Sequence, residues 1–142
     1  MSTEWSVSFD WSTTSLPSAG WMSIVHFTIG EDNGKYGDRT PAVFFYVDGD
    51  TKLFHFASAV NGQGYTFDET TSFRLNHKYH IEIHQRYISQ GNYRYFVKID
   101  GVEVKSVVNS DARQFYEVKV YAGDPWFAPI GYISNLHFTN FL

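Results

Sequence analysis

Apolar and polar residues alternate with a period of two along almost the whole chain. Near the amino terminus, Trp5, Val7, Phe9 and Trp11 alternate with Ser6, Ser8 and Asp10. Such alternation is typical of a β-strand with one buried face, and no segment shows an apolar repeat at helical spacing. The pattern recurs in about ten segments separated by turn residues, the spacing of a sandwich or barrel. The sequence therefore predicts an all-β protein.

The whole chain, residues 1–142, is predicted to form a single domain. It contains no repeat, low-complexity tract or linker. The first and last strand-like segments, which begin near Trp5 and Tyr132, are expected to pair as neighbours because this leaves few bare sheet edges. Asp48-Gly49 and Asp100-Gly101 predict tight hairpin turns. We expect an antiparallel two-sheet β-sandwich of the jelly-roll type.

Composition argues against several classes of partner. The net charge is -4 and the 11 Lys and Arg residues are scattered, so nucleic acid is not an expected partner. The absence of Cys rules out disulfides and thiolate catalysis. No apolar run approaches the ~20 residues of a membrane span, and the first residues lack the pattern of a signal peptide.

Known catalytic motifs are missing from the sequence. No strand segment carries the closely spaced carboxylates of a jelly-roll glycosidase, and the Gly-x-Ser-x-Gly, His-Glu-x-x-His and phosphate-loop motifs are absent. His80 and His84 share a strand face but would lie about 13 Å apart, too far for one metal ion. We expect them to flank Glu82 on an exposed surface, and we expect the protein not to be an enzyme.

The polar loop from Gly30 to Pro41 is rich in oxygen ligands. Carboxylate and amide groups, among them Asp38, form an inventory that suits a hard cation such as Ca²⁺. The alternative is a solvated turn, anchored by an ion pair of Asp38 and Arg39.

A second loop carries Asp124, Pro125 and Trp126. Pro125 and Pro129 each fix one backbone angle, so Trp126 is expected to be held in a defined orientation at low entropic cost. A rigid exposed aromatic ring suits the apolar face of a sugar, and Asp124 offers acceptors for hydroxyls or for a bound Ca²⁺. The alternative is that Trp126 packs back over the sandwich rim as a loop anchor.

Five segments together resemble one superfamily of sandwich domains. They read KYGDRTPAVFF, SAVNGQGY, YHIEIHQ, YFVKIDGVEVKSVVN and FYEVKVYAGDPWFAPIGYISNLHF. This set, from about Trp21 to Phe138, looks like the concanavalin A-like and laminin G-like superfamily. More narrowly, it is similar to lectin-like single domains of sea anemones and other cnidarians.

The resemblance implies a secreted, non-enzymatic lectin domain that binds glycans as a homo-oligomer. It places a site for galactose-type or other glycans near Asp38, Arg39, Asn61, Asp124 and Trp126, with Ca²⁺ on Asp38 and Asp124. The His-x-Asn-x-Arg pattern of galectins is absent, so a galectin-type site is not expected.

The alternative function is a laminin G-like protein-interaction module that uses an open sheet face. Its apolar patch would consist of Phe44, Tyr46, Phe54, Phe56 and Phe96.

Overall fold

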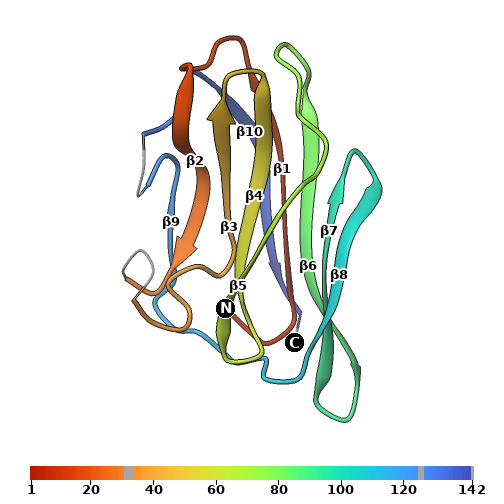
Figure 1. Cartoon of the computed structure of the whole chain (residues 1–142). Helices are drawn as coiled ribbons and strands as arrows, with labels where there is room; N and C mark the ends of the chain where they lie inside the picture. Colours follow the sequence, from red (N-terminus) through yellow and green to blue (C-terminus); the bar gives the residue numbers. More distant parts are fainter. Residues whose placement is uncertain (31–33, 125–126, 142) are drawn as a thin grey trace.

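The protein is a sandwich of two antiparallel sheets (Figure 1). The computed structural model describes residues 1–30, 34–124 and 127–141. In order, the strands are β1 (Trp5–Thr13), β2 (Ala19–Thr28), β3 (Ala42–Asp48), β4 (Thr51–Val60), β5 (Gln63–Asp68), β6 (Tyr79–Ser89), β7 (Asn92–Ile99), β8 (Val102–Asn109), β9 (Lys119–Tyr121) and β10 (Gly131–Asn140). Within these described ranges there is no helix that is long and apolar enough to cross a membrane.

Each sheet contains five strands. Sheet A has the order β10-β1-β6-β7-β8, and sheet B has the order β5-β4-β3-β2-β9. The expected pairing of the first and last strands is present, since Trp5 lies opposite Asn140 and Trp11 opposite Ile133. This topology confirms the predicted all-β jelly-roll sandwich.

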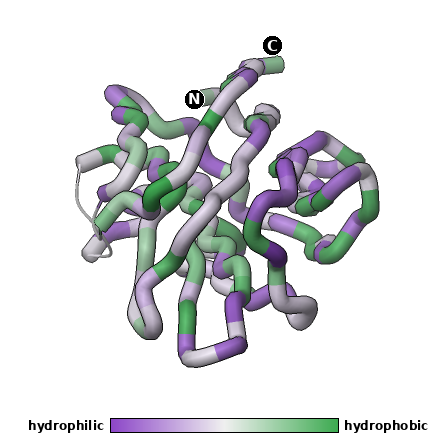
Figure 2. The backbone as a smooth tube through the Cα atoms, turned by 90° about the horizontal axis from the view of Figure 1, so that it is seen from above, coloured by the Kyte–Doolittle hydropathy of each residue, from purple (hydrophilic) through white to green (hydrophobic). Residues whose placement is uncertain are grey.

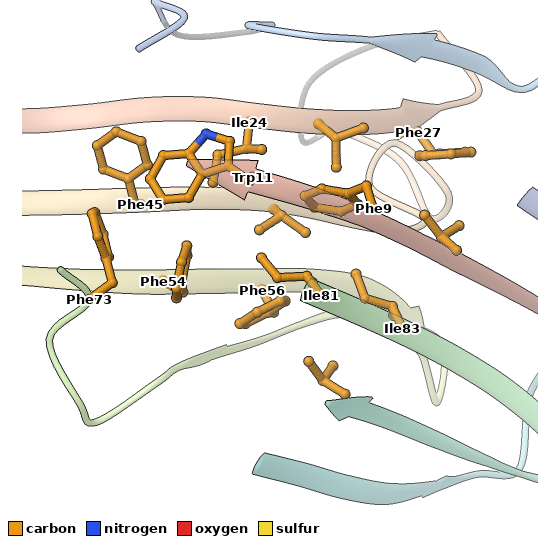
Figure 3. Close-up of a cluster of buried hydrophobic side chains, with 14 of the residues drawn as sticks. Phe9, Trp11, Ile24, Phe27, Phe45, Phe54, Phe56, Phe73, Ile81 and Ile83 are labelled. Carbon is orange, nitrogen blue, oxygen red and sulfur yellow. The ribbon is translucent and has the colours of Figure 1, made fainter. Parts of the chain in front are cut away.

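The core lies between the sheets and is aromatic at its centre (Figure 3). Along β1 the burial alternates at every residue, as the period-two pattern predicts. Trp11 packs against Phe45, Phe54 and Phe73 with ring centroids 5.5, 5.5 and 5.2 Å away. Tilted and edge-on contacts of this kind are the geometry that aromatic rings prefer.

Two local features differ from the prediction. The β3–β4 turn is shifted by one residue, because Asp48 pairs with Thr51 and leaves Gly49 and Asp50 as the central residues. The glycine-containing run from Asn61 to Tyr65 predicts a loop, but its residues from Gln63 onward belong to strand β5. Gly62, just before this strand, and Gly64, within it, have low β propensity. Pairing along β4 outweighs that local preference.

The two chain ends lie close together at one end of the sandwich (Figures 1 and 2). The Ser2 amide donates to Asn140 Oδ1 at 2.9 Å, and the Phe141 amide donates to the Glu4 carbonyl at 3.0 Å. Both termini are therefore tied to neighbouring strands of sheet A.

Replacement of a core aromatic tests this packing. Phe54→Ala should lower the free energy of unfolding by about 3–5 kcal/mol, because it removes a ring in contact with Trp11, Phe73 and Tyr79 and leaves a cavity. Chemical denaturation measures the loss. Val102→Ala, at a position that is 65% exposed, is the control and should stay within about 0.5 kcal/mol of the wild type. Equal losses in both variants would contradict this account of the core.

Candidate functional site

The outer face of sheet B carries a cluster of rings from three adjacent strands. Phe44 and Tyr46 alternate along β3 with residues that enter the core, so both point away from it. The register places Trp21 of β2 opposite Tyr46, and His55 of β4 opposite Phe44. Ring centroids lie 5.0 Å apart for Trp21 and Tyr46, 5.0 Å for Trp21 and His55, and 6.2 Å for Phe44 and His55. Trp21 is 37% exposed, so this aromatic surface reaches solvent.

A carboxylate from β5 extends the cluster. Asp68 lies opposite His55 in the register, and its Oδ1 is 2.7 Å from His55 Nδ1. The Asp68 side chain is 55% exposed, whereas that of His55 is 13% exposed. The histidine ring is therefore fixed between Trp21 and Asp68, and the carboxylate faces solvent beside the rings.

Two of the sequence-predicted loops meet at a buried histidine on the same face. His26 of β2 is fully buried, with Nε2 2.5 Å from the Asp38 carbonyl and Nδ1 3.3 Å from Asp124 Oδ2. Its ring also packs edge-on against Phe44, with centroids 5.9 Å apart. The loop before β3 and the loop after β9 are thus joined over the outer face of sheet B.

Arg39 and Asp38 have different surroundings at this junction. The Arg39 guanidinium lies over the Phe44 ring, 4.9 Å from its centroid, where a cation is favourable. Asp38 is 1% exposed, and its Oδ2 accepts hydrogen bonds from the amides of Gly34 and Lys35 at 2.7 and 2.5 Å. Asp38 thus fixes the loop from within, while Arg39 covers Phe44.

The two remaining predicted site residues are Asn61 and Trp126. Asn61, in the β4–β5 turn, donates through Nδ2 to the Val108 carbonyl and accepts at Oδ1 from the Ser110 amide. It connects that turn to the end of β8, and Tyr36 of the loop before β3 reaches the same region through a hydrogen bond from its hydroxyl to the Asp111 carbonyl at 3.1 Å. Trp126 lies outside the described residues.

The described residues include no group of three or more His, Asp or Glu side chains that could hold a metal ion. Residues 31–33, which belong to the predicted calcium loop, are outside the described part of the chain. Ca²⁺ on Asp38 and Asp124 stays a prediction.

The outer face of sheet A carries an ionic network. His80 Nδ1 lies 2.7 Å from Asp10 Oδ1 and its Nε2 3.3 Å from Glu82 Oε1, while His84 lies 3.8 Å from Glu82. The hydrogen bond with Asp10 raises the pKa of His80, and the hydrogen bond from Asn135 followed by that of His80 lowers the pKa of Asp10. Burial against Phe96 lowers the pKa of His84. Glu82 is thus flanked by the two histidines, as the sequence pattern predicted.

The apolar patch predicted for a protein-interaction module is not formed. Phe54 and Phe56 point into the core, and Phe44 and Phe96 are covered on their outer sides, so all four are buried. Only Tyr46 of the five remains partly exposed.

Sequence reasoning missed Trp21, His55 and Asp68 as one group. Each lies on a different strand, and only the cross-strand register brings them together. One signal was available for His55, because a polar residue between Phe54 and Phe56 must point away from the core if those two enter it.

Comparison with known proteins identifies the fold and no family. The sequence matches no protein-family model and no curated protein. The structure is similar to alginate lyase Aly36B, with a TM-score of 0.59 at 14% identity over 98% of this chain and 70% of that one. It is also similar to the alginate lyase from Klebsiella pneumoniae, with a TM-score of 0.58 at 11% identity over 96% of this chain and 59% of that one. A heptameric SAP-like pentraxin from Limulus polyphemus has a TM-score of 0.53 at 12% identity over 96% of this chain and 64% of that one.

These neighbours are jelly-roll sandwiches, in agreement with the concanavalin A-like class that the sequence predicted. The narrower similarity to cnidarian lectin-like domains stays a prediction.

The neighbours also correct one expectation. The chain was expected not to be an enzyme, but alginate lyases are enzymes with this fold, so neither the fold nor the missing motifs argue against catalysis. At 11–15% identity the likeness establishes the fold and assigns no reaction to this chain.

The Asp10–His80 pair gives a testable pH dependence. Because the pKa of His80 is raised in the folded state, the stability that the pair contributes is fully present below the ordinary histidine value of 6.5 and is lost as the pH rises through the raised value. The stability difference between wild type and His80→Gln should therefore shrink as the pH rises through that window. Chemical denaturation at several pH values measures it. Val102→Ala, which removes no titratable group from an exposed position of β8, is the control and should give a difference that is flat with pH; a flat difference for His80→Gln would contradict the assignment.

Proposed function

We propose that this domain binds carbohydrate through the outer face of sheet B. The observation that carries the proposal is the ring cluster of Trp21, Tyr46 and His55 with the solvent-facing carboxylate of Asp68 beside it. These four residues together with Arg39 are called the sheet B site.

The sheet B site combines the two kinds of group that a sugar requires. The apolar C–H face of a pyranose stacks on an indole ring, and Trp21 offers such a ring, part exposed and held in place by Tyr46 and His55. Sugar hydroxyls need acceptors and donors nearby. The Asp68 carboxylate accepts hydrogen bonds, and a guanidinium such as that of Arg39 donates them.

The same fold carries oligosaccharide ligands in other proteins. Variants of alginate lyase Aly36B have been solved with an alginate tetrasaccharide and with an alginate trisaccharide. For this chain we propose a lectin-type glycan site, of the galactose type or another. It includes the loop of Asp124 and Trp126 as a rim, because Asp124 contacts His26 beneath the same face. Ca²⁺ on Asp38 and Asp124 is part of this proposal and is tested with it.

Glycan-array binding of the purified domain, with Ca²⁺ and with EDTA, tests the proposal. We expect selective binding that Trp21→Ala weakens about tenfold or more, since loss of a stacking contact of about 1.5 kcal/mol corresponds to a factor of about ten. Asp68→Asn keeps the size of the side chain and removes its charge, and it should also weaken binding. Tyr87→Ala, which removes an aromatic ring that is 53% exposed on sheet A, is the matched control and should bind as the wild type does.

Two results would contradict the sheet B site. The first is the absence of glycan binding in either buffer. The second is binding that Trp126→Ala abolishes and Trp21→Ala leaves intact, which would assign the glycan to the rim alone. The glycans that bind are also incubated with the domain and examined for cleavage, so that catalysis is tested in the same samples.

A further inference from the structure

A pocket opens between the two sheets where the chain crosses from sheet B to sheet A. After β5, the segment 69–78 runs from one sheet to the other and leads into β6 (Figure 1). The amide of Phe73 donates to the Lys52 carbonyl at 2.9 Å, which ties this crossing segment to β4. The pocket is lined in part by the crossing segment and has a volume of about 170 Å³.

Three aromatic rings form the apolar part of the pocket. They belong to Phe54 of β4, Phe73 of the crossing segment and Tyr79 of β6. Ring centroids lie 4.7 Å apart for Phe54 and Phe73, 5.3 Å for Phe54 and Tyr79, and 6.4 Å for Phe73 and Tyr79. Figure 3 shows Phe73 beside Phe54 at one end of the core. Ile99 and Val104, on the two strands of the β7–β8 hairpin, complete the apolar wall.

The mouth of the pocket carries one carboxylate. Glu69 is half-buried there, next to the exposed residues Thr71 and Ser72. Its Oε1 accepts hydrogen bonds from the amides of Thr70 and Thr71 at 2.8 and 3.2 Å, which hold the side chain in place. Within the described residues, the hydrogen bonds to this side chain all use Oε1, so Oε2 can face a bound cation. Among the described lining residues, Glu69 is the only one with a charged side chain.

We propose that this pocket binds a small quaternary ammonium ion of the kind that choline carries. A cation is attracted to the face of an aromatic ring, and the attraction is greater where water is excluded. The Glu69 carboxylate at the mouth adds a charge of opposite sign. Rings and acid therefore favour the same kind of ligand.

The lining favours a methylated ammonium over one that carries protons. A primary ammonium brings three N–H donors, and each donor that leaves water without gaining a partner costs free energy. Most of the lining is ring and alkyl surface. The hydroxyls of Tyr79 and Ser72 already accept hydrogen bonds from backbone amides, at 2.7 and 3.2 Å. Methyl groups need no such partners and pack directly against the rings.

The size and position of the pocket separate it from the sheet B site. An apolar cavity of about 150 Å³ binds benzene, and a trimethylammonium group is of similar size. A pyranose with its hydroxyls is larger and more polar. The pocket also lies on the inner side of sheet B, since Phe54 is buried in the core and the neighbouring His55 contacts Trp21 on the outer face. This inference therefore goes beyond the glycan proposal and does not depend on it.

Proton NMR of choline mixed with the purified domain tests the site. The signal of the N-methyl protons should shift upfield in a saturable way, because these protons would lie over ring faces. The neutral carbon analogue of choline, in which a tert-butyl group replaces the trimethylammonium, should bind about tenfold more weakly. Ethanolamine, whose ammonium carries no methyl groups, should also bind more weakly. The absence of a saturable shift with choline, or equal binding of the neutral analogue, would overturn the proposal.

Two variants and a control locate the binding. Glu69→Gln keeps the size of the side chain and its Oε1 acceptor and removes the charge, so it should weaken choline binding about fivefold. Val104→Phe fills the pocket and should abolish binding. Glu103→Gln makes the same change at a carboxylate that pairs with Arg94 outside the pocket, and it should bind as the wild type does. Equal weakening by the two Gln variants would rule out the pocket, whether or not Val104→Phe folds.

The quaternary ammonium can belong to a free small molecule or to a lipid headgroup. Co-sedimentation with phosphatidylcholine vesicles separates the two sources, with phosphatidylglycerol vesicles as the control. Sedimentation with phosphatidylcholine alone, reduced by Glu69→Gln, would assign the site to the headgroup. Choline binding without sedimentation would assign it to a soluble ligand. Sedimentation that Glu69→Gln leaves unchanged would contradict a headgroup in this pocket.

Discussion

The two-residue period of the side chains along β3 and β4 is the constraint on which both the core and the candidate site depend. Phe45 and Phe54 can reach Trp11 only if Phe44 and His55 point the other way. A slip of one residue would exchange the two sets, which would bury His55 and expose the core phenylalanines. The aromatic core therefore fixes the register, and the register in turn aligns His55 with Asp68 and Tyr46 with Trp21.

The two outer faces of the sandwich differ in physical character. On sheet A, charged side chains are satisfied by one another, as in the pairs Arg94–Glu103 and Arg86–Glu4 at 2.6 and 2.7 Å. A ligand there would have to break these pairs before it could bind. On sheet B, rings make most of the contacts, and a ligand can stack on Trp21 while the contact between His55 and Asp68 stays in place. This contrast favours sheet B for a neutral or weakly polar ligand such as a sugar.

Local patterns could predict the strands and the sandwich, because alternation and turn residues act within a few positions of the chain. They could also predict that Asp38, Arg39 and Asp124 belong to loops. They could not predict that Asp38 is buried, since its burial depends on a loop conformation that brings the backbone amides of Gly34 and Lys35 to its Oδ2. Nor could they group Trp21 with His55, because these residues are brought together by Tyr46 and Phe44 on the strand between them. Strand β5 was missed for the same reason, since a glycine-containing segment becomes a strand only when a long neighbour such as β4 offers its edge.

The closeness of the two chain ends has a consequence for how this sandwich can be rebuilt. The hydrogen bonds of Ser2 to Asn140 and of Phe141 to Glu4 hold the ends of β1 and β10 side by side. A short linker can therefore join the termini, and the chain can be opened instead at an exposed turn such as Gln90-Gly91 without the loss of any strand pairing. In such a permuted protein β6 would end the chain and β7 would begin it. The order in which the strands are connected is thus separable from the order in which they lie in the sheets.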